Sequence, residues 1–321
     1  MIAKPNNQNS LLRGFMAKVP ENEFLNKIAQ IIKFDKFRPM LDECYQSIGR
    51  CAYDPVVLLK MLLLQRWYNL SDRAVVAEAA DRISFRLFLK LDIDKQPPDD
   101  TTLVRFRNRL DENGIYDKLM TKLEKQLADS ALKINEGRIT IVDATLIEAY
   151  TRPKSDDPSH LEQHDPGAGI TYRKKKGPIC GYKCHAAMDS ETRIIRQVEV
   201  TGAAEHEVKH LLIPPGTEEL MADKGYHSAE NRRKLKQRGV RDRIMYRGAR
   251  AHPLTEQQKA HNRPISRARS AIESKFGEMK RWNGLRRAIY RGIDRVRRQV
   301  ILTVLAVNMK RLSAILAQST G

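Results

Sequence analysis

Two aspartates in the second half of the chain stand where a carboxylate is costly without a positively charged partner. Asp143 interrupts the apolar alternation of RITIVDATLIEAY, in the middle of an expected strand. Asp223 ends an expected strand and precedes Lys224-Gly225, whose glycine lets the chain turn sharply out of a sheet. A carboxylate buried in this way needs an arginine or a bound metal ion beside it. For Asp143 alone, both partners remain open.

A third acid, Glu273, is placed by helical periodicity. At 100° per residue, one apolar stripe of its helix must face the sheet, and it consists of Ile265, Ala268, Ile272, Phe276 and Met279. Glu273 lies on the bordering stripe, with Arg269 one turn before it and Lys280 two turns after it. The same spacing fits a surface ladder of salt bridges, each worth about 0.2–0.5 kcal/mol. Periodicity therefore leaves both interpretations of Glu273 open.

Three carboxylates that converge on one sheet edge would form an all-oxygen site of the kind that magnesium or manganese prefers. Two such ions, about 3.5–4 Å apart, can hold the attacking and the leaving oxygen of a phosphoryl transfer. They would also offset the mutual repulsion of the carboxylates. Arg269 and Lys280 would then suit a different task, which is to hold DNA phosphates beside the metal ions.

The formal net charge of +19 lies entirely in the last third of the chain. Residues 1–223 carry 33 Lys and Arg against 33 Asp and Glu, whereas residues 224–321 carry 25 against 6. An excess this one-sided predicts an anionic partner, either nucleic acid or an anionic membrane surface. The basic residues are spread over several segments with strand-like and turn-like stretches between them, which disfavours a single membrane-lying helix. Nucleic acid is the favoured partner.

The composition indicates a globular protein, since 41% of the 321 residues are hydrophobic and 30% are charged, enough for two domains. No apolar run approaches the roughly 20 residues that span a bilayer. The first residues, MIAKPNNQNS, lack the apolar segment of a secretory signal, so an intracellular protein is expected. The cysteines fit no zinc spacing and are interpreted as free thiols: Cys44, Cys51, Cys180 and Cys184.

Residues 21–135 are expected to form an all-α domain, after a flexible segment at residues 1–20. Three helix starts are marked by capping side chains: Asp54 before Pro55, then Ser71, then Asp99 or Asp100. The last of these helices carries three arginines: Arg105, Arg107 and Arg109. Two short helices followed by this basic helix predict a helix-turn-helix-like DNA-binding domain. An ordinary helical bundle gives the same pattern.

From residue 138 the hydrophobic period changes from 3.6 to 2. The expected strands are 138–150, 180–189, 193–203, 218–226 and 241–248, and the expected helices are 205–213, 228–239 and about 265–282. The stretch 151–177 is expected to be a loop. The order strand-strand-strand-helix-strand-helix-strand-helix predicts an α/β domain at residues 136–285, with helices on the faces of a mixed sheet. A basic C-terminal helix is expected within residues 286–321.

The three acidic segments together resemble the DDE transposases of bacterial insertion sequences. The matching pieces are VDATLIEA around Asp143, MADKGYHS around Asp223 and SRARSAIESKFGEMKR around Glu273. The last piece resembles the family signature of Tyr, two residues, Arg, three residues, Glu, six residues and Lys, with Ser266 in place of the tyrosine. DPVVLLKMLLLQRWYNLSDR and DDTTLVRFRNRL resemble the helical domain of the group related to insertion sequences four and five, closer to the latter.

This resemblance implies an RNase H-like catalytic domain in a cytoplasmic bacterial enzyme. The enzyme would cut double-stranded DNA at the ends of an element and join the freed 3′-hydroxyl to target DNA. The implied cofactors are two divalent ions, magnesium or manganese, held by Asp143, Asp223 and Glu273. An element has two ends to be paired, so a homodimer on DNA is expected.

Weaker candidates for DNA contact are Lys183, His185 and Lys224. His185 could lie beside the metal ions or a phosphate, but a lone strand histidine is also typical of a satisfied structural residue. The rival function is a transposon-derived DNA-binding repressor that no longer cuts, and a membrane-associated basic protein is a distant third. Retention of all three carboxylates with Arg269 and Lys280 argues against the repressor.

Overall fold

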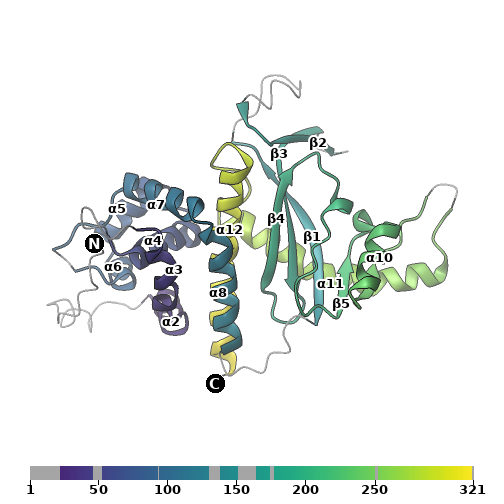
Figure 1. Cartoon of the computed structure of the whole chain (residues 1–321), viewed down its shortest axis with the longest axis horizontal. Helices are drawn as coiled ribbons and strands as arrows, with labels where there is room; N and C mark the ends of the chain where they lie inside the picture. Colours follow the sequence, from purple (N-terminus) through teal and green to yellow (C-terminus); the bar gives the residue numbers. More distant parts are fainter. Residues whose placement is uncertain are drawn as a thin grey trace. The chain divides into compact units, whose positions relative to one another are not determined.

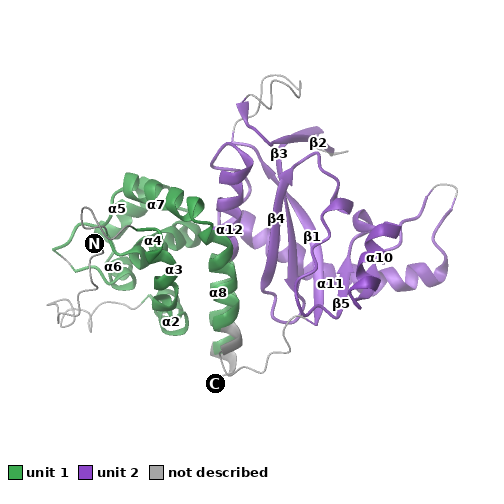
Figure 2. Cartoon of the chain, viewed as in Figure 1, with its two compact units in different colours: residues 1–132, 305–321 green, residues 133–304 purple. Residues whose placement is uncertain are grey.

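The structure, a computed structural model, describes residues 22–45, 53–92, 94–129, 138–150, 164–173, 177–249 and 252–319. The chain divides into two compact units, shown in different colours in Figure 2. Unit 1 comprises residues 1–132 and 305–321, and unit 2 comprises residues 133–304. The segment expected to be flexible, residues 1–20, lies outside the described residues.

Unit 1 is helical throughout its described residues, as the sequence predicts (Figure 1). Its elements are α2 (Glu23–Ile31), the 3₁₀ turn η1 (Phe34–Phe37), α3 (Arg38–Asp42), α4 (Pro55–Tyr68), α5 (Asp72–Asp81), α6 (Ile83–Leu89), α7 (Asp100–Glu112) and α8 (Ile115–Asp129). The last part of α12 (Ile293–Ser319) also belongs to this unit.

The helix starts of unit 1 confirm the predicted caps. Asp54 accepts a hydrogen bond from the Val56 amide at 2.9 Å, with Pro55 at the first helical position of α4. Ser71 and Asp99 accept from the amides three residues later, at the starts of α5 and α7. Each such cap contributes about 0.5–2 kcal/mol to helix stability.

Helix α4 forms the centre of unit 1, because it is buried on nearly every side. Its buried apolar side chains include Leu58, Leu59, Met61, Leu62, Leu63 and Leu64. The Trp67 ring packs edge-on against Phe24 and Phe88, and its indole N–H donates to the Ala306 carbonyl at 2.9 Å. This all-round burial explains why the sequence of α4 shows a continuous apolar run and not a single stripe.

Unit 2 is built on a six-stranded mixed sheet, which confirms the predicted α/β architecture. Its strands are β1 (Ile139–Glu148), β2 (Gly169–Arg173), β3 (Gly177–Asp189), β4 (Ile195–Gly202), β5 (Glu219–Ala222) and β6 (Arg241–Ile244). They pair in the order β2-β3-β1-β5-β6, with β4 also paired to β3. Strands β1, β5 and β6 are parallel, whereas β2, β3 and β4 pair antiparallel.

The helix expected at residues 205–213 is absent, which corrects one step of the predicted element order. Only the 3₁₀ turn η2 (Glu207–Lys209) forms there. His210 Nδ1 lies 2.8 Å from a carboxylate oxygen of Glu199 on β4, and Leu212 is buried in the core beside the sheet. The segment is therefore mostly extended, and the apolar residues whose spacing suggested a helix contact the sheet instead. The expected loop at 151–177 also contains a strand, β2.

The helices of unit 2 cover the sheet. Helix α10 (Ala229–Gln237) lies beside β6, and α11 (Glu256–Trp282) packs against β1, β5 and β6. Helix α11 begins earlier than expected, at a capping box of Thr255 and Gln258, and Pro264 lies within it. The predicted start near residue 265 therefore missed the first part of this helix.

The C-terminal helix α12 is apolar through its middle, although the sequence suggested a basic helix. Arg295, Arg297 and Arg298 stand near its start, and Lys310 and Arg311 follow the apolar stretch, whose buried side chains include Val300, Ile301, Leu302, Val304, Leu305 and Val307. Among the described helices, Ile293–Leu316 is long and apolar enough to cross a membrane by length and composition. Because 72% of that window is buried within the protein, it resembles a core helix.

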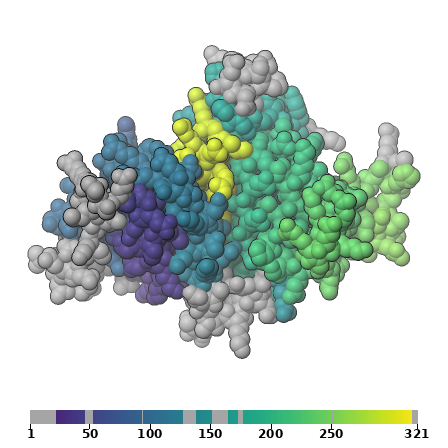
Figure 3. Space-filling view, viewed as in Figure 1, coloured from purple at the N-terminus to yellow at the C-terminus, as the bar shows by residue number. Residues whose placement is uncertain are grey.

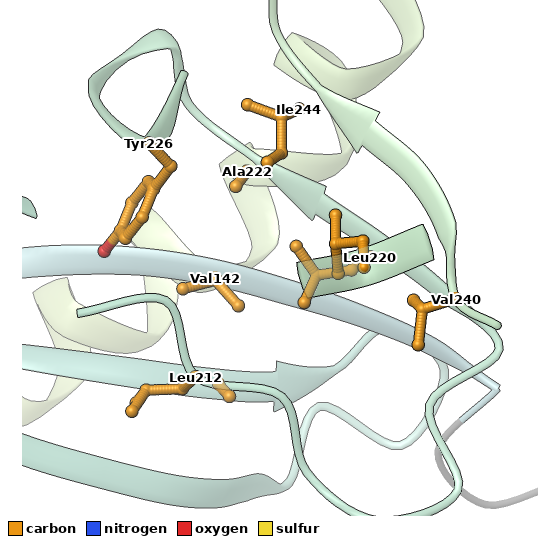
Figure 4. Close-up of a cluster of buried hydrophobic side chains, with 9 residues drawn as sticks. Val142, Leu212, Leu220, Ala222, Tyr226, Val240 and Ile244 are labelled. Carbon is orange, nitrogen blue, oxygen red and sulfur yellow. The ribbon is translucent and has the colours of Figure 1, made fainter. Parts of the chain in front are cut away.

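A hydrophobic cluster holds the centre of the sheet to its surroundings (Figure 4). Its members are Val142, Ala187, Leu212, Leu220, Ala222, Tyr226, Leu235, Val240 and Ile244. Each of these side chains is at most 7% exposed. Val142 on β1 and Ala222 on β5 each stand one residue before a predicted catalytic aspartate, so the cluster fixes the backbone that carries both.

Candidate active site

The sheet register brings two of the predicted acids side by side. Strands β1 and β5 are parallel neighbours, and Val142 pairs with Ala222. Asp143 and Asp223 are the next residues along these strands, so they leave adjacent strands at the same level. Asp223 caps the 3₁₀ turn η3 (Lys224–Tyr226), and its carboxylate accepts the Lys224 amide at 2.6 Å. The third acid, Glu273, comes from α11, which packs on both strands.

One guanidinium group joins the three carboxylates. Arg269 Nη2 lies 2.9 Å from Asp143 Oδ2, and the same nitrogen lies 3.3 Å from Glu273 Oε1. Arg269 Nη1 lies 3.4 Å from Asp223 Oδ1. The structure therefore brings together all three acids that the sequence predicted to converge, around a side chain that had been assigned to DNA.

The three carboxylates differ in their exposure to solvent. The side chain of Asp143 is 10% exposed, that of Asp223 is 25% exposed and that of Glu273 is 58% exposed. Burial raises the pKa of the Asp143 carboxyl, and the charge and hydrogen bond of Arg269 only partly oppose this effect. Two acids are thus held in the sheet, whereas Glu273 reaches the site from its open side.

The guanidinium of Arg269 is stabilised as a cation in this setting. Burial lowers its pKa, but the negative charges of Asp143, Asp223 and Glu273 outweigh burial and raise the pKa overall. Its side chain is 15% exposed. The group therefore remains charged and compensates part of the negative charge of the cluster.

The donor set fits a hard divalent cation in its chemistry, since three carboxylates supply only oxygen ligands. As the side chains stand, however, no group of three or more His, Cys, Asp or Glu in the described part of the chain is arranged to hold a metal ion. Arg269 explains why suitable ligands are not arranged around an ion, because its guanidinium contacts all three acids.

Two residues near the site carried no prediction. Tyr226, at the end of η3, is fully buried, and its hydroxyl has no hydrogen-bond partner among the described residues. Burial raises the pKa of this phenol, and the negative charges of Glu207 and Asp143 raise it further. Glu207 lies against the η3 turn, where a Cβ added at Gly225 would meet its Oε2 at 2.5 Å. The sequence signal for Tyr226 was the Lys-Gly-Tyr run after Asp223, whereas Glu207 carried none.

The lysines predicted to contact DNA occupy different settings. Lys224 is exposed directly beside Asp223. Lys280 is half-buried on α11, and its charge acts on the buried thiol of Cys184 in β3. Lys183 is 12% exposed, donates to the Glu205 carbonyl at 2.6 Å and lies 3.7 Å from Glu207. Lys183 therefore has structural partners, and a DNA role for it would need these contacts to be released.

The structure contradicts the proposed position of His185 beside the metal ions or DNA. In the antiparallel pairing of β1 and β3, Asp143 lies opposite Ala186, so His185 points to the other face of the sheet. His185 is fully buried, and its Nε2 is 3.0 Å from Thr201 Oγ1. Its ring stacks on that of His210 with 4.6 Å between centroids. His185 is therefore a structural residue of the sheet and not a contact for metal ions or DNA.

Of the three arginines on α7, the structure removes one from the candidate DNA surface. Arg107 is 5% exposed and bound to Asp72 of α5, so it cannot reach a phosphate without breaking that pair. Arg105 and Arg109 are exposed, and Arg109 lies over the Tyr45 ring at 4.8 Å. DNA contact by Arg105 and Arg109 remains a prediction.

Comparison with known families covers both units. Residues 13–109 match the family described as Transposase domain (DUF772), and residues 134–309 match the family described as Transposase DDE domain. Among solved structures, a piggyBac transposase synaptic complex with hairpin DNA is similar over 98% of this chain and 77% of that one. The sequence identity is 10% and the TM-score is 0.45, so this likeness adds nothing to the family matches.

Proposed function

We propose that in this chain, which belongs to the DDE transposases, Asp143, Asp223 and Glu273 hold two divalent metal ions, magnesium or manganese, for cutting and joining DNA. The chain belongs to this family because the catalytic domain of the family matches more than half of it. The protein is a DNA transposase with an RNase H-like catalytic domain. The observation that carries the residue assignment is the meeting of three carboxylates, from two strands and one helix, at a single guanidinium.

Each acid suits a different part of this task. Asp143 and Asp223 are fixed by the register of β1 and β5, which gives two ligands on a rigid base. Glu273 is more exposed and lies on a helix, so its side chain is free to adjust when DNA arrives. Bound divalent ions would supply charge compensation and orientation for the attacking and leaving oxygens at phosphorus.

The DNA strand must pass the open side of this cluster. Lys224 stands exposed beside Asp223, and the basic excess of residues 224–321 continues along the first half of α11. The first half of α11, in light green, lies at the surface of unit 2 in the space-filling view (Figure 3). We assign phosphate contacts to Lys224, Lys280 and Arg269, and end recognition to the helical unit with Arg105 and Arg109. Two copies of the chain would pair the two ends of the element.

Conservative substitutions of the acids test the assignment. Asp143→Asn, Asp223→Asn and Glu273→Gln should each lower single-turnover nicking of end DNA by at least about 1,000-fold, which is about 4 kcal/mol of lost transition-state stabilisation. End binding and the melting temperature should survive. Glu256→Gln, an exposed acid at the start of the same helix, is the matched control. The end sequences come from inverted repeats in the DNA that flanks the gene.

The outcomes separate enzyme from repressor. A substitution that leaves nicking at the wild-type rate removes that residue from the site. A wild-type chain that binds its end DNA tightly but never nicks it, with either magnesium or manganese, would support the silent DNA-binding repressor instead.

A further inference from the structure

The strongest unexplained feature of the site is the position of Arg269 between carboxylates that are assigned to metal ions. We infer that Arg269 and the divalent ions compete for the same three carboxylates, so that metal binding releases the guanidinium of Arg269 toward DNA phosphate. This inference rests on the proposed function, because it takes Asp143, Asp223 and Glu273 as the metal ligands.

Geometry excludes Arg269 and a metal ion from the same position. A magnesium ion needs its oxygen ligands at about 2.0–2.1 Å in near-octahedral geometry. The Arg269 nitrogens already lie 2.9 Å from Asp143 Oδ2, 3.4 Å from Asp223 Oδ1 and 3.3 Å from Glu273 Oε1. The guanidinium bridges the three acids, and in this arrangement their carboxylate oxygens are not placed to coordinate a metal ion. For a metal ion to bridge them, the guanidinium must withdraw.

The charges favour such an exchange. One guanidinium carries a single positive charge against three carboxylates, so the cluster keeps a net negative charge while Arg269 holds it. Two divalent ions would carry four positive charges, and Arg269 would then be repelled by the ions that replace it. The same residue is therefore stabilising without metal and unfavourable with it.

The released side chain has a destination of suitable chemistry. Arg269 lies on α11 beside the acids, where the strand to be cut must come close to the metal ions. A planar guanidinium binds phosphate oxygens through two parallel hydrogen bonds, which a lysine cannot match. Metal binding would thus prepare a phosphate contact at the cleavage site, and the metal-free protein would keep that contact closed.

Direct manganese binding tests the competition without any DNA cleavage. Titration of the full-length protein with Mn²⁺, followed by the electron paramagnetic resonance signal of the free ion, gives the affinity. Arg269→Gln should bind Mn²⁺ about ten-fold more tightly than wild type, which is about 1.4 kcal/mol. Arg267→Gln removes an exposed arginine two residues away and should leave the affinity unchanged. If Arg269 only positioned the carboxylates, Arg269→Gln would bind the ion equally or more weakly, which overturns the inference.

A measurement on the wild-type chain keeps the inference testable if the variant does not fold. Phenylglyoxal modifies exposed guanidinium groups, and mass spectrometry of peptides reports each site. Saturating Mg²⁺ should raise the modification of Arg269 several-fold and leave Arg267 unchanged. Unchanged or reduced modification of Arg269 overturns the inference. A wild-type chain without saturable Mn²⁺ binding would contradict the proposed function itself, whereas binding that is insensitive to Arg269 contradicts only the competition.

Discussion

Arg107 on α7 and Asp72 on α5 form a largely buried ion pair, in which Arg107 Nη1 lies 2.7 Å from Asp72 Oδ1. Gln65 of α4 donates to the same carboxylate at 2.6 Å. Burial alone would raise the pKa of Asp72, but the hydrogen bonds and charge of Arg107 outweigh it and lower the pKa. Three helices of the helical unit are therefore joined at one carboxylate, and the arginine serves the fold.

Removal of one partner should expose the structural role of this pair. Arg107→Ala should lower the free energy of unfolding by about 3 kcal/mol, because it leaves a half-buried carboxylate without its cation. Urea denaturation measures this change, and Arg105→Ala on the exposed face of α7 should change stability by less than about 0.5 kcal/mol. Full stability of Arg107→Ala together with weakened binding to end DNA would restore Arg107 to the DNA surface.

The sequence predicted those parts of the fold that depend on local chemistry. The caps at Asp54, Ser71 and Asp99 are interactions within one helical turn, so their residue types suffice to locate them. The alternation around Asp143 predicted β1, and the helical stripe predicted that Glu273 borders the sheet. The family resemblance then joined three acids whose convergence no local pattern could establish.

The errors arose where the partner is distant in sequence. The alternation of side chains along a strand shows that Asp143 and Ala144 point to opposite faces of the sheet. It does not show which residue of β3 pairs with Asp143, and this register places His185 on the face opposite to Asp143. The arginine spacing on α7 likewise could not show that Asp72 binds Arg107. Nor could the helical spacing of Arg269 reveal its contacts with Asp143 and Asp223, since these come from other elements.

The buried His185 predicts a specific acid sensitivity. Burial, followed by the charges of His210 and Lys183, lowers the pKa of His185 to about 3. The unfolded chain, with a histidine pKa of about 6.5, then binds one more proton than the folded chain between these two values. This contribution to stability is complete above about pH 6.5 and is lost as the pH falls toward 3, by up to about 1.4 kcal/mol per pH unit.

His185→Gln should reduce the loss of unfolding free energy as the pH falls below about 6.5. Free energies of unfolding at several pH values between 4 and 7 should show a smaller slope for the variant than for wild type. His206→Gln, an exposed histidine on the segment before η2, serves as the control. Equal slopes for wild type and His185→Gln would show that His185 is not held neutral by the fold.

The salt dependence of DNA binding can locate the phosphate contact beside the active site. Lys224 is exposed directly after Asp223, so its ammonium is placed to neutralise a phosphate of the strand that the carboxylates act on. Each neutralised phosphate contributes about −0.9 to the slope of log K against log salt concentration on B-form DNA. Lys224→Gln should therefore weaken binding to end DNA at low salt and make the slope less negative by about 0.9.

A lysine in a surface ion pair supplies the comparison for Lys224. Lys234 on α10 is exposed as well, but its ammonium lies 2.7 Å from Glu230, so its charge is already partly compensated. Both variants lose one positive charge, and only a phosphate contact distinguishes them. If net charge alone governed affinity, Lys224→Gln and Lys234→Gln would shift binding equally, and the contact assigned to Lys224 would be wrong. A change in slope confined to Lys224→Gln places a phosphate beside Asp223, where strand cleavage requires it.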